Sequence, residues 1–500
     1  MRFHHHRGIS VAKAPGFLSI ITGGVLIFAL QAGGQTFSVL HTFTSGSGPD
    51  ATNFDGANPS GTLISAGGTL YGTAMYGGAL GWGTVFSVQT NGEGFTAAHN
   101  FTGGVDGANP SGGVILSNNT LYGTAGAGGI AGAGTVFAVN TNGSGFSTLH
   151  SFTATVNDSF GVYTNVDGAH PQAGVMLSGN KLYGAANNGG ASGQGTLFAL
   201  SVTGAIFTTL HGFSSGSGGA YSSAGLMLLG NMLYGVNYGN LGNGTVFAIA
   251  TNGTGFTNYY AFTVGHANGS GIITNSDGAN PYAKLLLSGG QLYGTAQHGG
   301  KSGNGTVFAI RPDGTGFRTL ISFAPGAFNS SGLYTNSDGA NPSADLIVSG
   351  STLYGTASAG GRFGNGTVFQ INTDGTAFTN LHSFTATPPY PQPQINRDGA
   401  NPSGGLVLLG NILYGTAASG GCLGNGTLFT IALGPVSVSA PMLSIIPSGA
   451  YVIVTWPSNY PGALLQTAPA MAGPFTDIPC ATCPYTNAAV GSQRFYRLSR

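Results

Sequence analysis

Six aspartates are the first residues in this sequence whose type and spacing could do chemistry, because each begins a repeated Asp-Gly-Ala-(Asn/His)-Pro motif. They are Asp55, Asp106, Asp167, Asp277, Asp338 and Asp398, and five have an asparagine two residues earlier, at Asn53, Asn165, Asn275, Asn336 and Asn396. Stretches such as "TNSDGAN" resemble calcium loops, but one carboxylate in each loop is few for a calcium cage. Asp-Gly is also turn chemistry, in which the carboxylate caps nearby N–H groups. Six equivalent copies favour the turn, so no cofactor is expected and calcium is the alternative.

Five histidines share another repeat position and could in principle bind a metal. They are His41, His99, His150, His211 and His382. Tyr260 and Ile321 occupy the same position in other repeats. A site that accepts an aromatic or aliphatic side chain indicates packing rather than metal binding. His170, which replaces an asparagine of the aspartate motif, is interpreted in the same way.

The remaining acidic residues provide no obvious pair for acid–base catalysis. They are Asp50, Glu93, Asp158, Asp313, Asp345, Asp374 and Asp477. An enzyme built on repeats is expected to break their symmetry with a unique carboxylate pair or a Ser/His/Asp set. No such set stands out, so no catalytic residue is predicted.

Three cysteines add little chemistry. Cys480 and Cys483 form a single Cys-x-x-Cys, which lacks the second ligand pair of a zinc site. In an oxidising compartment they are candidates for a local disulfide, and Cys422 is expected to be a free thiol.

A tandem repeat must position these residues. Leu-Tyr-Gly occurs seven times, and Gly-Thr-(Val/Leu)-Phe follows each copy, with 15 residues from tyrosine to phenylalanine in six repeats and 13 in the fourth. Another phenylalanine comes 9 residues later, and a closing one 6 residues after that. Two-residue turns such as Gly-Gly or Gly-Asn come just before each Leu-Tyr-Gly and suit type I′ or II′ hairpins. Each repeat therefore predicts four antiparallel strands.

Four such strands cannot bury a core alone, but sheets stacked radially can, and ring closure removes exposed strand edges. The predicted fold is all-β, a seven-bladed β-propeller over residues 35–432, with a parallel β-helix as the runner-up. The fourth strand follows only six repeats. Its missing copy is "FSVLHTF", residues 37–43, which we expect to close the ring in the last blade beside residues 426–431.

In this topology the loops between second and third strands and the connections between blades open on one face, and the short hairpin turns lie on the other. The predicted ligand-binding residues on the loop-rich face are Tyr76, Trp82, Tyr163, Tyr238, His298, Tyr334, Arg362 and Phe363. Further aromatic residues of the long connections are Phe160, Tyr221, Phe328 and Tyr390. An aromatic, amide-rich and nearly uncharged face suits neutral sugars, because rings stack and amides bond hydroxyls. The alternative is that these are loop residues without a ligand.

The combined motif "DGANPSGGL…LYGTA…GG…GNGTVF…G.GF..LHSF" resembles the Gloeo_Verruco tandem-repeat family of secreted bacterial proteins, over roughly residues 35–432. The resemblance implies an exported location and little about activity. Members of the family often end in a hydrophobic sorting anchor, whereas this chain ends in "RFYRLSR".

The two ends differ from the repeats. Residues 1–34 predict a signal peptide: Arg2, Arg7 and Lys13 precede the apolar run 16–30, and small residues follow. Residues 435–500 predict a small β-sandwich-like module, with strands at 451–456, 463–467 and 494–498, that looks like an immunoglobulin or fibronectin module.

The small number of charged residues limits the classes of function that this chain can have. The chain has 13 basic and 13 acidic residues, and only 5% of it is charged, against about 25% for an average domain. Nucleic-acid binding is excluded, because it requires clustered Lys and Arg. We expect an exported, monomeric and non-catalytic scaffold, secreted or at the cell surface, with no membrane span after removal of residues 1–34. Its expected partner is a neutral glycan or a cell-surface protein. The alternative is an extracellular polysaccharide lyase or glycoside hydrolase on a propeller scaffold.

Overall fold

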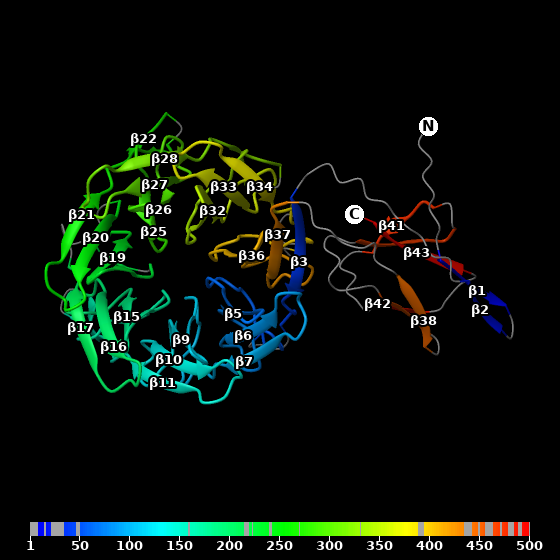
Figure 1. The fold of residues 1–500 in the computed structure, drawn as a ribbon, viewed down its shortest axis with the longest axis horizontal. Helices are drawn as coiled ribbons and strands as arrows, with labels where there is room; N and C mark the ends of the chain where they lie inside the picture. Colours follow the sequence, from blue (N-terminus) through cyan, green and yellow to red (C-terminus); the bar gives the residue numbers. More distant parts are fainter. Residues whose placement is uncertain are drawn as a thin grey trace. The chain divides into compact units, whose positions relative to one another are not determined.

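Strands and loops make up the fold (Figure 1). The computed structural model describes residues 9–14, 17–21, 35–46, 51–158, 161–214, 220–222, 224–239, 243–269, 271–330, 332–388, 395–434, 443–448, 451–455, 464–470, 473–478, 485–488 and 493–499. Within these residues every regular element is a β-strand, as predicted. Among them there is no helix with the length and hydropathy that crossing a membrane requires.

The chain divides into two compact units. The repeat unit is His41–Thr90 with Gly94–Phe429, and the terminal unit is Met1–Leu40, Asn91–Glu93 and Thr430–Arg500. The division falls within β3 (Thr36–Thr42) and β37 (Thr427–Ala432), whose sheet is described here with the repeats.

The first three repeats form antiparallel sheets whose strands follow chain order. Their strands are β4 (Ile64–Ala66), β5 (Thr69–Ala74), β6 (Thr84–Gln89) and β7 (Thr96–Asn100); β8 (Ile115–Ser117), β9 (Thr120–Ala125), β10 (Thr135–Asn140) and β11 (Ser147–Ser151); and β14 (Met176–Ser178), β15 (Lys181–Ala186), β16 (Thr196–Ser201) and β17 (Phe207–Gly212).

The fourth, fifth and sixth repeats follow the same pattern. Their strands are β18 (Met227–Leu229), β19 (Met232–Asn237), β20 (Thr245–Ala250) and β21 (Thr257–Ala261); β25 (Leu286–Ser288), β26 (Gln291–His298), β27 (Thr306–Ile310) and β28 (Arg318–Ser322), joined by β24 (Ala279–Pro281); and β31 (Ile347–Ser349), β32 (Thr352–Ala357), β33 (Thr367–Asn372) and β34 (Thr379–Ser383). Small hairpins in the connections are β12 (Val156–Asn157) with β13 (Tyr163–Thr164), β22 (His266–Ala267) with β23 (Ile273–Thr274), and β29 (Ala327–Phe328) with β30 (Tyr334–Thr335).

The seventh repeat departs from chain order. Its sheet contains β35 (Val407–Leu409) and β36 (Ile412–Ala417), and its strand order is β3-β37-β36-β35. An N-terminal strand thus takes the outer place that the fourth strand of a repeat holds elsewhere, beside the segment that the sequence indicated. Figure 1 shows the sheets of the repeat unit following one another around a ring.

Sequence dictates the pairing within each sheet. The turn between β4 and β5 is Gly67-Gly68, with φ of 55° and 81°, as a type I′ hairpin requires. The glycine of Leu-Tyr-Gly is needed for a different reason, because a Cβ on Gly72 would lie 2.6 Å from the fully buried ring of Phe86. The repeated glycine thus makes room for the repeated phenylalanine.

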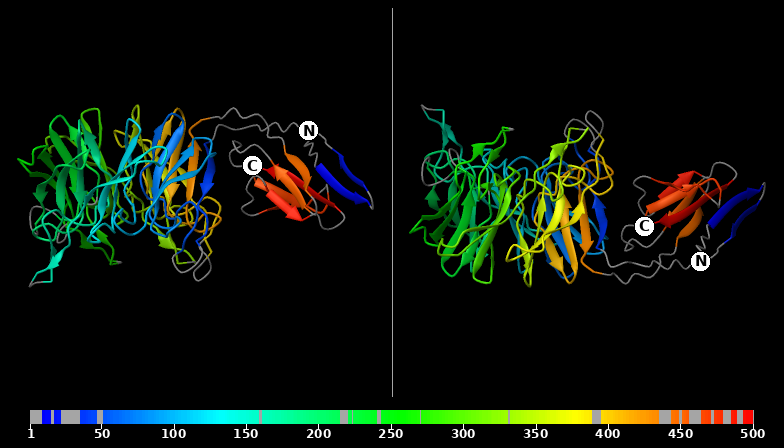
Figure 2. Two further views of the ribbon diagram at one scale, coloured as in Figure 1. Left: turned by 90° about the horizontal axis from the view of Figure 1, so that it is seen from below. Right: turned by 90° about the horizontal axis from the view of Figure 1, so that it is seen from above.

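One backbone hydrogen bond joins each repeat to the repeat before it. Among the described residues it recurs from Asn109 N to Trp82 O, His170 N to Ala133 O, Tyr221 N to Gln194 O, Asn280 N to Asn243 O, Asn341 N to Asn304 O, Asn401 N to Asn365 O and Asn58 N to Asn425 O. The last of these bonds joins the first repeat to the seventh. Seen from the side in Figure 2, the strands run between the two faces of the ring, so the connections lie on those faces.

The terminal unit is also all-β. One of its sheets has the order β2-β1-β43-β40-β41 and another the order β38-β39-β42. The strands are β1 (Ile9–Ala14), β2 (Phe17–Ile21), β38 (Ser444–Ser448), β39 (Tyr451–Thr455), β40 (Leu464–Ala468), β41 (Thr476–Asp477), β42 (Tyr485–Ala488) and β43 (Gln493–Ser499). Ile445, Val454 and Tyr496 belong to its core. The signal peptide and the immunoglobulin-like module stay predictions.

Candidate functional site

The repeated aspartates lie at the junctions between neighbouring repeats. Asp55 is fully buried, and its carboxylate accepts hydrogen bonds from His41 Nε2 at 2.7 Å and from the backbone N and Oγ1 of Thr44 at 3.0 and 2.5 Å. The His41 ring stacks on Phe95, with centroids 4.1 Å apart. The expectation that the carboxylate caps its own turn is therefore wrong, because it bonds the end of the preceding outer strand, 11 residues away.

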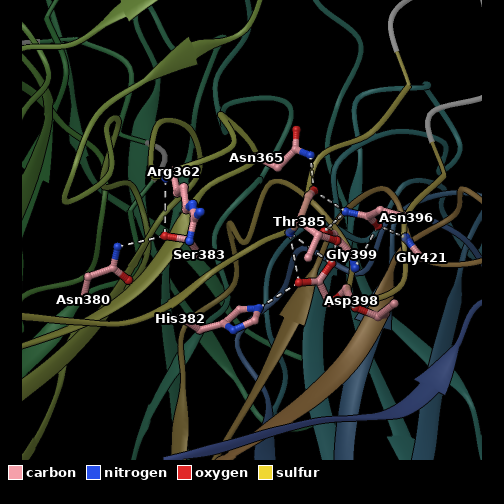
Figure 3. A network of polar contacts seen from close by, with 11 residues as sticks. Arg362, Asn365, Asn380, His382, Ser383, Thr385, Asn396, Asp398, Gly399 and Gly421 are labelled. Atoms are coloured by element: carbon pink, nitrogen blue, oxygen red, sulfur yellow. Dashed lines mark hydrogen bonds and ion pairs between the residues drawn. The ribbon is translucent and has the colours of Figure 1, made fainter. Parts of the chain in front are cut away.

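The same network recurs in other repeats, and Figure 3 shows it around Asp398. His382 Nε2 lies 2.8 Å from the Asp398 carboxylate, and Thr385 donates to it from both its backbone N and Oγ1. In the repeat of Asp277, Tyr260 replaces the histidine and donates its hydroxyl at 2.7 Å. The strand histidines do pack against phenylalanines as predicted, but four of them, His41, His99, His150 and His382, also bond a carboxylate, which the sequence did not indicate.

Two of these aspartates show what the network does electrostatically. Burial opposes ionisation of Asp167, but hydrogen bonds from His150 and Thr153 hold its pKa below the usual value. Asp338 lacks both partners, because Ile321 and Ala324 occupy their positions, and burial raises its pKa. The network thus stabilises a buried carboxylate that would otherwise resist ionisation.

The asparagine two residues earlier is the residue that caps the turn. Asn53 Oδ1 accepts from Gly56 N at 2.9 Å and from Gly78 N at 2.6 Å, and Asn53 Nδ2 donates to Thr44 O at 2.7 Å. The equivalent asparagines Asn165, Asn275, Asn336 and Asn396 accept the same pair of glycine N–H groups. Aspartate and asparagine side chains together tie each connection to the strand and loop beside it.

These contacts do not suit the calcium alternative. Both Asp55 carboxylate oxygens and the Asn53 amide oxygen already accept hydrogen bonds from protein donors. In the part of the chain that the structure describes, no group of three or more His, Cys, Asp and Glu side chains could hold a metal ion.

The predicted ligand-binding residues are distributed around the ring. Tyr76 and Trp82 lie in one loop of the first repeat and are 47% and 46% exposed. Tyr163, in β13, is 61% exposed, and His298 ends β26 and is exposed. Tyr238 belongs to the fourth repeat. The structure therefore brings Tyr76 and Trp82 into one loop but does not gather the whole set at one point.

The candidates of the fifth and sixth repeats are partly used within the protein. The Tyr334 hydroxyl accepts from Gly326 N at 2.7 Å and contacts Asn304 Nδ2 at 3.0 Å. The Arg362 guanidinium lies 5.3 Å from the centre of the Phe363 ring. Two other aromatic candidates, Phe160 and Tyr390, lie outside the described residues.

Two polar features were missed by the sequence reasoning. The first is a stack of half-buried tyrosines in which Tyr238 lies between Tyr221, at 5.4 Å between centroids, and Tyr282, at 5.9 Å. The second is a central cavity of about 210 Å³, lined by residues of all seven repeats and including Lys284 and Asp345. The sequence did contain a signal for this cavity. Lys284 and Asp345 lie seven residues after the motif aspartate, where other repeats mostly have glycine, and Tyr282 lies five residues after it, where other repeats mostly have serine.

The cysteine expectations have different outcomes. Cys422 takes part in a disulfide, so the expectation of a free thiol is wrong. The predicted disulfide between Cys480 and Cys483 falls on residues outside the described ones, and it competes with the disulfide of Cys422 because the chain has three cysteines.

The fold and site define a tandem-repeat protein whose four-stranded antiparallel sheets form a β-propeller-like unit. The chain belongs to the Gloeobacter/Verrucomicrobia repeat family, whose family model matches residues 21–165, 153–334 and 272–442. No curated protein matches the sequence significantly.

Solved structures resemble the chain at low sequence identity. An oligogalacturonate lyase in complex with manganese is 11% identical, with a TM-score of 0.44, and the match covers 81% of this chain and 97% of the lyase. TolB from Acinetobacter baumannii is 12% identical, with a TM-score of 0.34, covering 61% of this chain and 60% of TolB. A chain of a nidogen/laminin complex is 12% identical, with a TM-score of 0.33, covering 68% of this chain and 89% of that chain.

Proposed function

We propose that this protein is an exported, non-catalytic binding scaffold: a closed, monomeric seven-bladed β-propeller that binds neutral glycans through its loop-rich face. It acts outside the cell or at the cell surface, and the C-terminal immunoglobulin-like module serves as a spacer or attachment module. Residues 1–34 act as the signal peptide that directs export.

Equivalent contacts around the ring support closure. The hydrogen bond from Asn58 N to Asn425 O, at 2.9 Å, is equivalent to the bonds that link all the remaining pairs of successive repeats. Phe43 N also donates to Gly426 O at 3.1 Å, as Phe101 N does to Gly83 O at 3.0 Å within the first repeat. A ring closed by backbone hydrogen bonds leaves few exposed strand edges and can hold variable loops on a rigid frame.

The chemistry of the exposed loops carries the glycan assignment. Large aromatic side chains such as Tyr76, Trp82 and Tyr163 are about half exposed or more, on a chain in which only 5% of the residues are charged. Stacking removes the exposed aromatic ring and the C–H face of a sugar from water, which favours binding, and amides and hydroxyls nearby can replace the water bonded to sugar hydroxyls. A highly charged partner would find few complementary groups on this chain.

The test is retention on neutral polysaccharides. Protein lacking residues 1–34 is run in native affinity gels containing a panel of soluble neutral and acidic polysaccharides. We expect slower migration in at least one neutral polysaccharide, reduced in a Tyr76→Ala/Trp82→Ala variant. Ile206→Ala is the matched control, because Ile206 is 66% exposed in a hairpin turn on the opposite face. Unchanged migration in every gel would contradict the proposal.

The same panel separates binding from turnover. Each polysaccharide is incubated with the protein, and reducing ends are measured over a day. Retention without release of reducing ends supports a binder. Release that increases with protein concentration would instead identify a lyase or hydrolase.

A further inference from the structure

The central cavity lies where the first strands of all seven repeats converge, since equivalent positions of every repeat line it. One ring of positions, five residues after the motif aspartate, contains Ser60, Ser111, Ser343 and Ser403 in four repeats. The next ring of equivalent positions, seven residues after the aspartate where a repeat has one, contains glycine in four repeats: Gly113, Gly174, Gly225 and Gly405. The first three of these glycines line the cavity. If these two rings of positions had only a structural role, we would expect small residues in every repeat.

Glycines and long side chains share one repeat position at the cavity. Gly113, Gly174 and Gly225 belong to the second, third and fourth repeats, whereas Lys284 and Asp345 hold this position in the fifth and sixth. A Cβ on Gly113 would lie 2.5 Å from Thr62 O, so this glycine lets the neighbouring repeat approach closely, and a Cβ on Gly225 would lie 3.4 Å from Lys284 Cδ, so the lysine side chain passes beside Gly225. The asymmetry puts both lining charges on one wall.

Asp345 is held in place by the protein. Its two carboxylate oxygens accept from the backbone N of Lys284 at 2.8 Å and from Thr62 Oγ1 at 3.1 Å. Thr62 belongs to the first repeat, and Gly405 of the intervening seventh repeat has no side chain to obstruct this contact. The Lys284 ammonium has no ion-pair partner among the described residues.

The cavity continues into the tyrosine stack. Tyr282 lines the cavity and donates its hydroxyl to Gln172 Oε1 at 3.3 Å, while its ring stacks on Tyr238 at an interplanar angle of 28°. The Asn187 amide nitrogen is 3.5 Å from the Tyr238 hydroxyl. A polar pocket and a row of aromatic rings therefore adjoin at Tyr282.

Two buried polar atoms at this site have no partner. Ser60 lines the cavity, and its Oγ is buried beside it and makes no hydrogen bond among the described residues. Asn187 is only 6% exposed, and its Oδ1 also accepts no hydrogen bond within the described chain. Buried polar groups without partners are costly and are commonly satisfied by water or a ligand.

We propose that the central cavity binds one terminal, uncharged sugar residue of the glycan, and that the tyrosine stack of Tyr282, Tyr238 and Tyr221 contacts the residues that follow it. This rests on the proposed glycan-binding function and names the subsite and the ligand end. A volume of about 210 Å³ is below the roughly 300–1,000 Å³ of pockets for drug-sized ligands, so it fits one ring and not a chain.

The lining groups match a polyhydroxylated and uncharged ring. Lys284 and Asp345 are the charged groups of the lining, and their charges cancel, so a net charge on the ligand would be left uncompensated. Gln172 and the lysine ammonium offer hydrogen-bond partners for ring hydroxyls. Charge-assisted hydrogen bonds to hydroxyls are stronger than bonds between neutral groups.

The test uses the chain without residues 1–34 and neutral oligosaccharides cut from the retained polysaccharide. Calorimetry compares the wild type with Lys284→Met, Tyr282→Ala and Gly225→Val, the last of which fills the cavity at a position without positive φ. We expect each to weaken binding by about 5- to 10-fold with the melting temperature maintained. Ile206→Ala, in an exposed hairpin turn of the third repeat, serves as the control and should change the affinity less than twofold.

The outcomes distinguish the subsite from the function. Wild-type affinity in all three cavity variants would overturn the central subsite and leave glycan binding intact. Preference of the wild type for carboxylated over neutral sugars would overturn the choice of an uncharged residue. Absence of any saccharide binding by the wild type would overturn both proposals. If chemical capping of the oligosaccharide end that enters the cavity prevents binding, the result supports the subsite.

Discussion

At the scale of single residues, the same aspartate behaves differently according to two neighbours. Asp167 has His150 and Thr153 as donors, and its pKa is lowered despite burial. Asp338 has the backbone N of Ala324 at 2.9 Å, and its pKa is raised by burial. The protein therefore contains its own comparison between a supported and a poorly supported buried carboxylate.

Replacing each of these two aspartates by asparagine should lower the free energy of unfolding by different amounts. Asp167→Asn places an amide donor among groups that already donate, and it should lower the free energy of unfolding by about 1–3 kcal/mol at pH 7. Asp338→Asn removes a carboxylate that resists ionisation, so its cost should be under about 1 kcal/mol. Urea titrations of both variants measure the difference. Equal costs would show that the histidine and threonine donors do not support the carboxylate.

Two histidines whose pKa is lowered by burial make stability depend on pH. Desolvation lowers the pKa of His99, despite its bond to Asp106, and that of His211, which stacks on Phe256. A lowered pKa means that the unfolded chain binds protons first, so stability is complete above the unfolded pKa of about 6.5 and falls as pH decreases below it. The melting temperature should be higher at pH 7.5 than at pH 5.5. His211→Phe should reduce that difference, and an unchanged difference would contradict the role of His211.

At the scale of elements, the repeat spacing was enough to predict the strands but not the contacts between repeats. Leu-Tyr-Gly, the two-glycine turn and the buried phenylalanines act over a few residues, so their spacing reflects local geometry. The partners of Asp55 and Asp345 come from another strand end and another repeat, at distances that sequence spacing does not report. For the same reason, the tyrosine stack and the cavity charges were missed although their residues were visible in the sequence.

One turn position suggests a stabilising substitution. The asparagine of the aspartate motif has a left-handed backbone, with φ of 55° at Asn109, and its Nδ2 donates to Met75 O of the preceding repeat at 3.1 Å. His170 holds this position with φ of 54°, and its buried Nδ1 has no partner among the described residues.

His170→Asn should therefore stabilise the protein by about 0.5–1.5 kcal/mol, because asparagine tolerates positive φ and regains one hydrogen bond. The reverse change, Asn109→His, is the matched control and should destabilise by a similar amount. Differential scanning calorimetry of both variants checks the prediction. A lower melting temperature for His170→Asn would show that the histidine has another role.

At the scale of the whole repeat unit, the junction of the seventh and first repeats lacks a threonine contact that four other junctions have. The junctions after the third and fourth repeats lack it as well, because Ala185 and Val236 hold that position. Thr73, Thr124 and Thr356 donate their hydroxyls to backbone carbonyls of the next repeat. At the seventh-to-first junction, the equivalent Thr416 hydroxyl is buried without a partner in the described chain. The junction therefore depends more on the segment around Phe43, which is fully buried.

Removing residues 35–44 together with residues 1–34 tests whether this segment closes the ring. The deletion removes Phe43, whose buried ring alone is worth about 3–5 kcal/mol, and the His41 and Thr44 donors to Asp55. We expect the melting temperature to fall by about 10 °C or more relative to a chain that lacks residues 1–34 only. Limited proteolysis should then cut first in the first and seventh repeats, since an open ring exposes the edge of β37. Phe152→Ala, at the same repeat position away from the junction, should lower stability without concentrating the cuts there. An unchanged melting temperature in the deleted chain would show that the ring holds without its N-terminal strand.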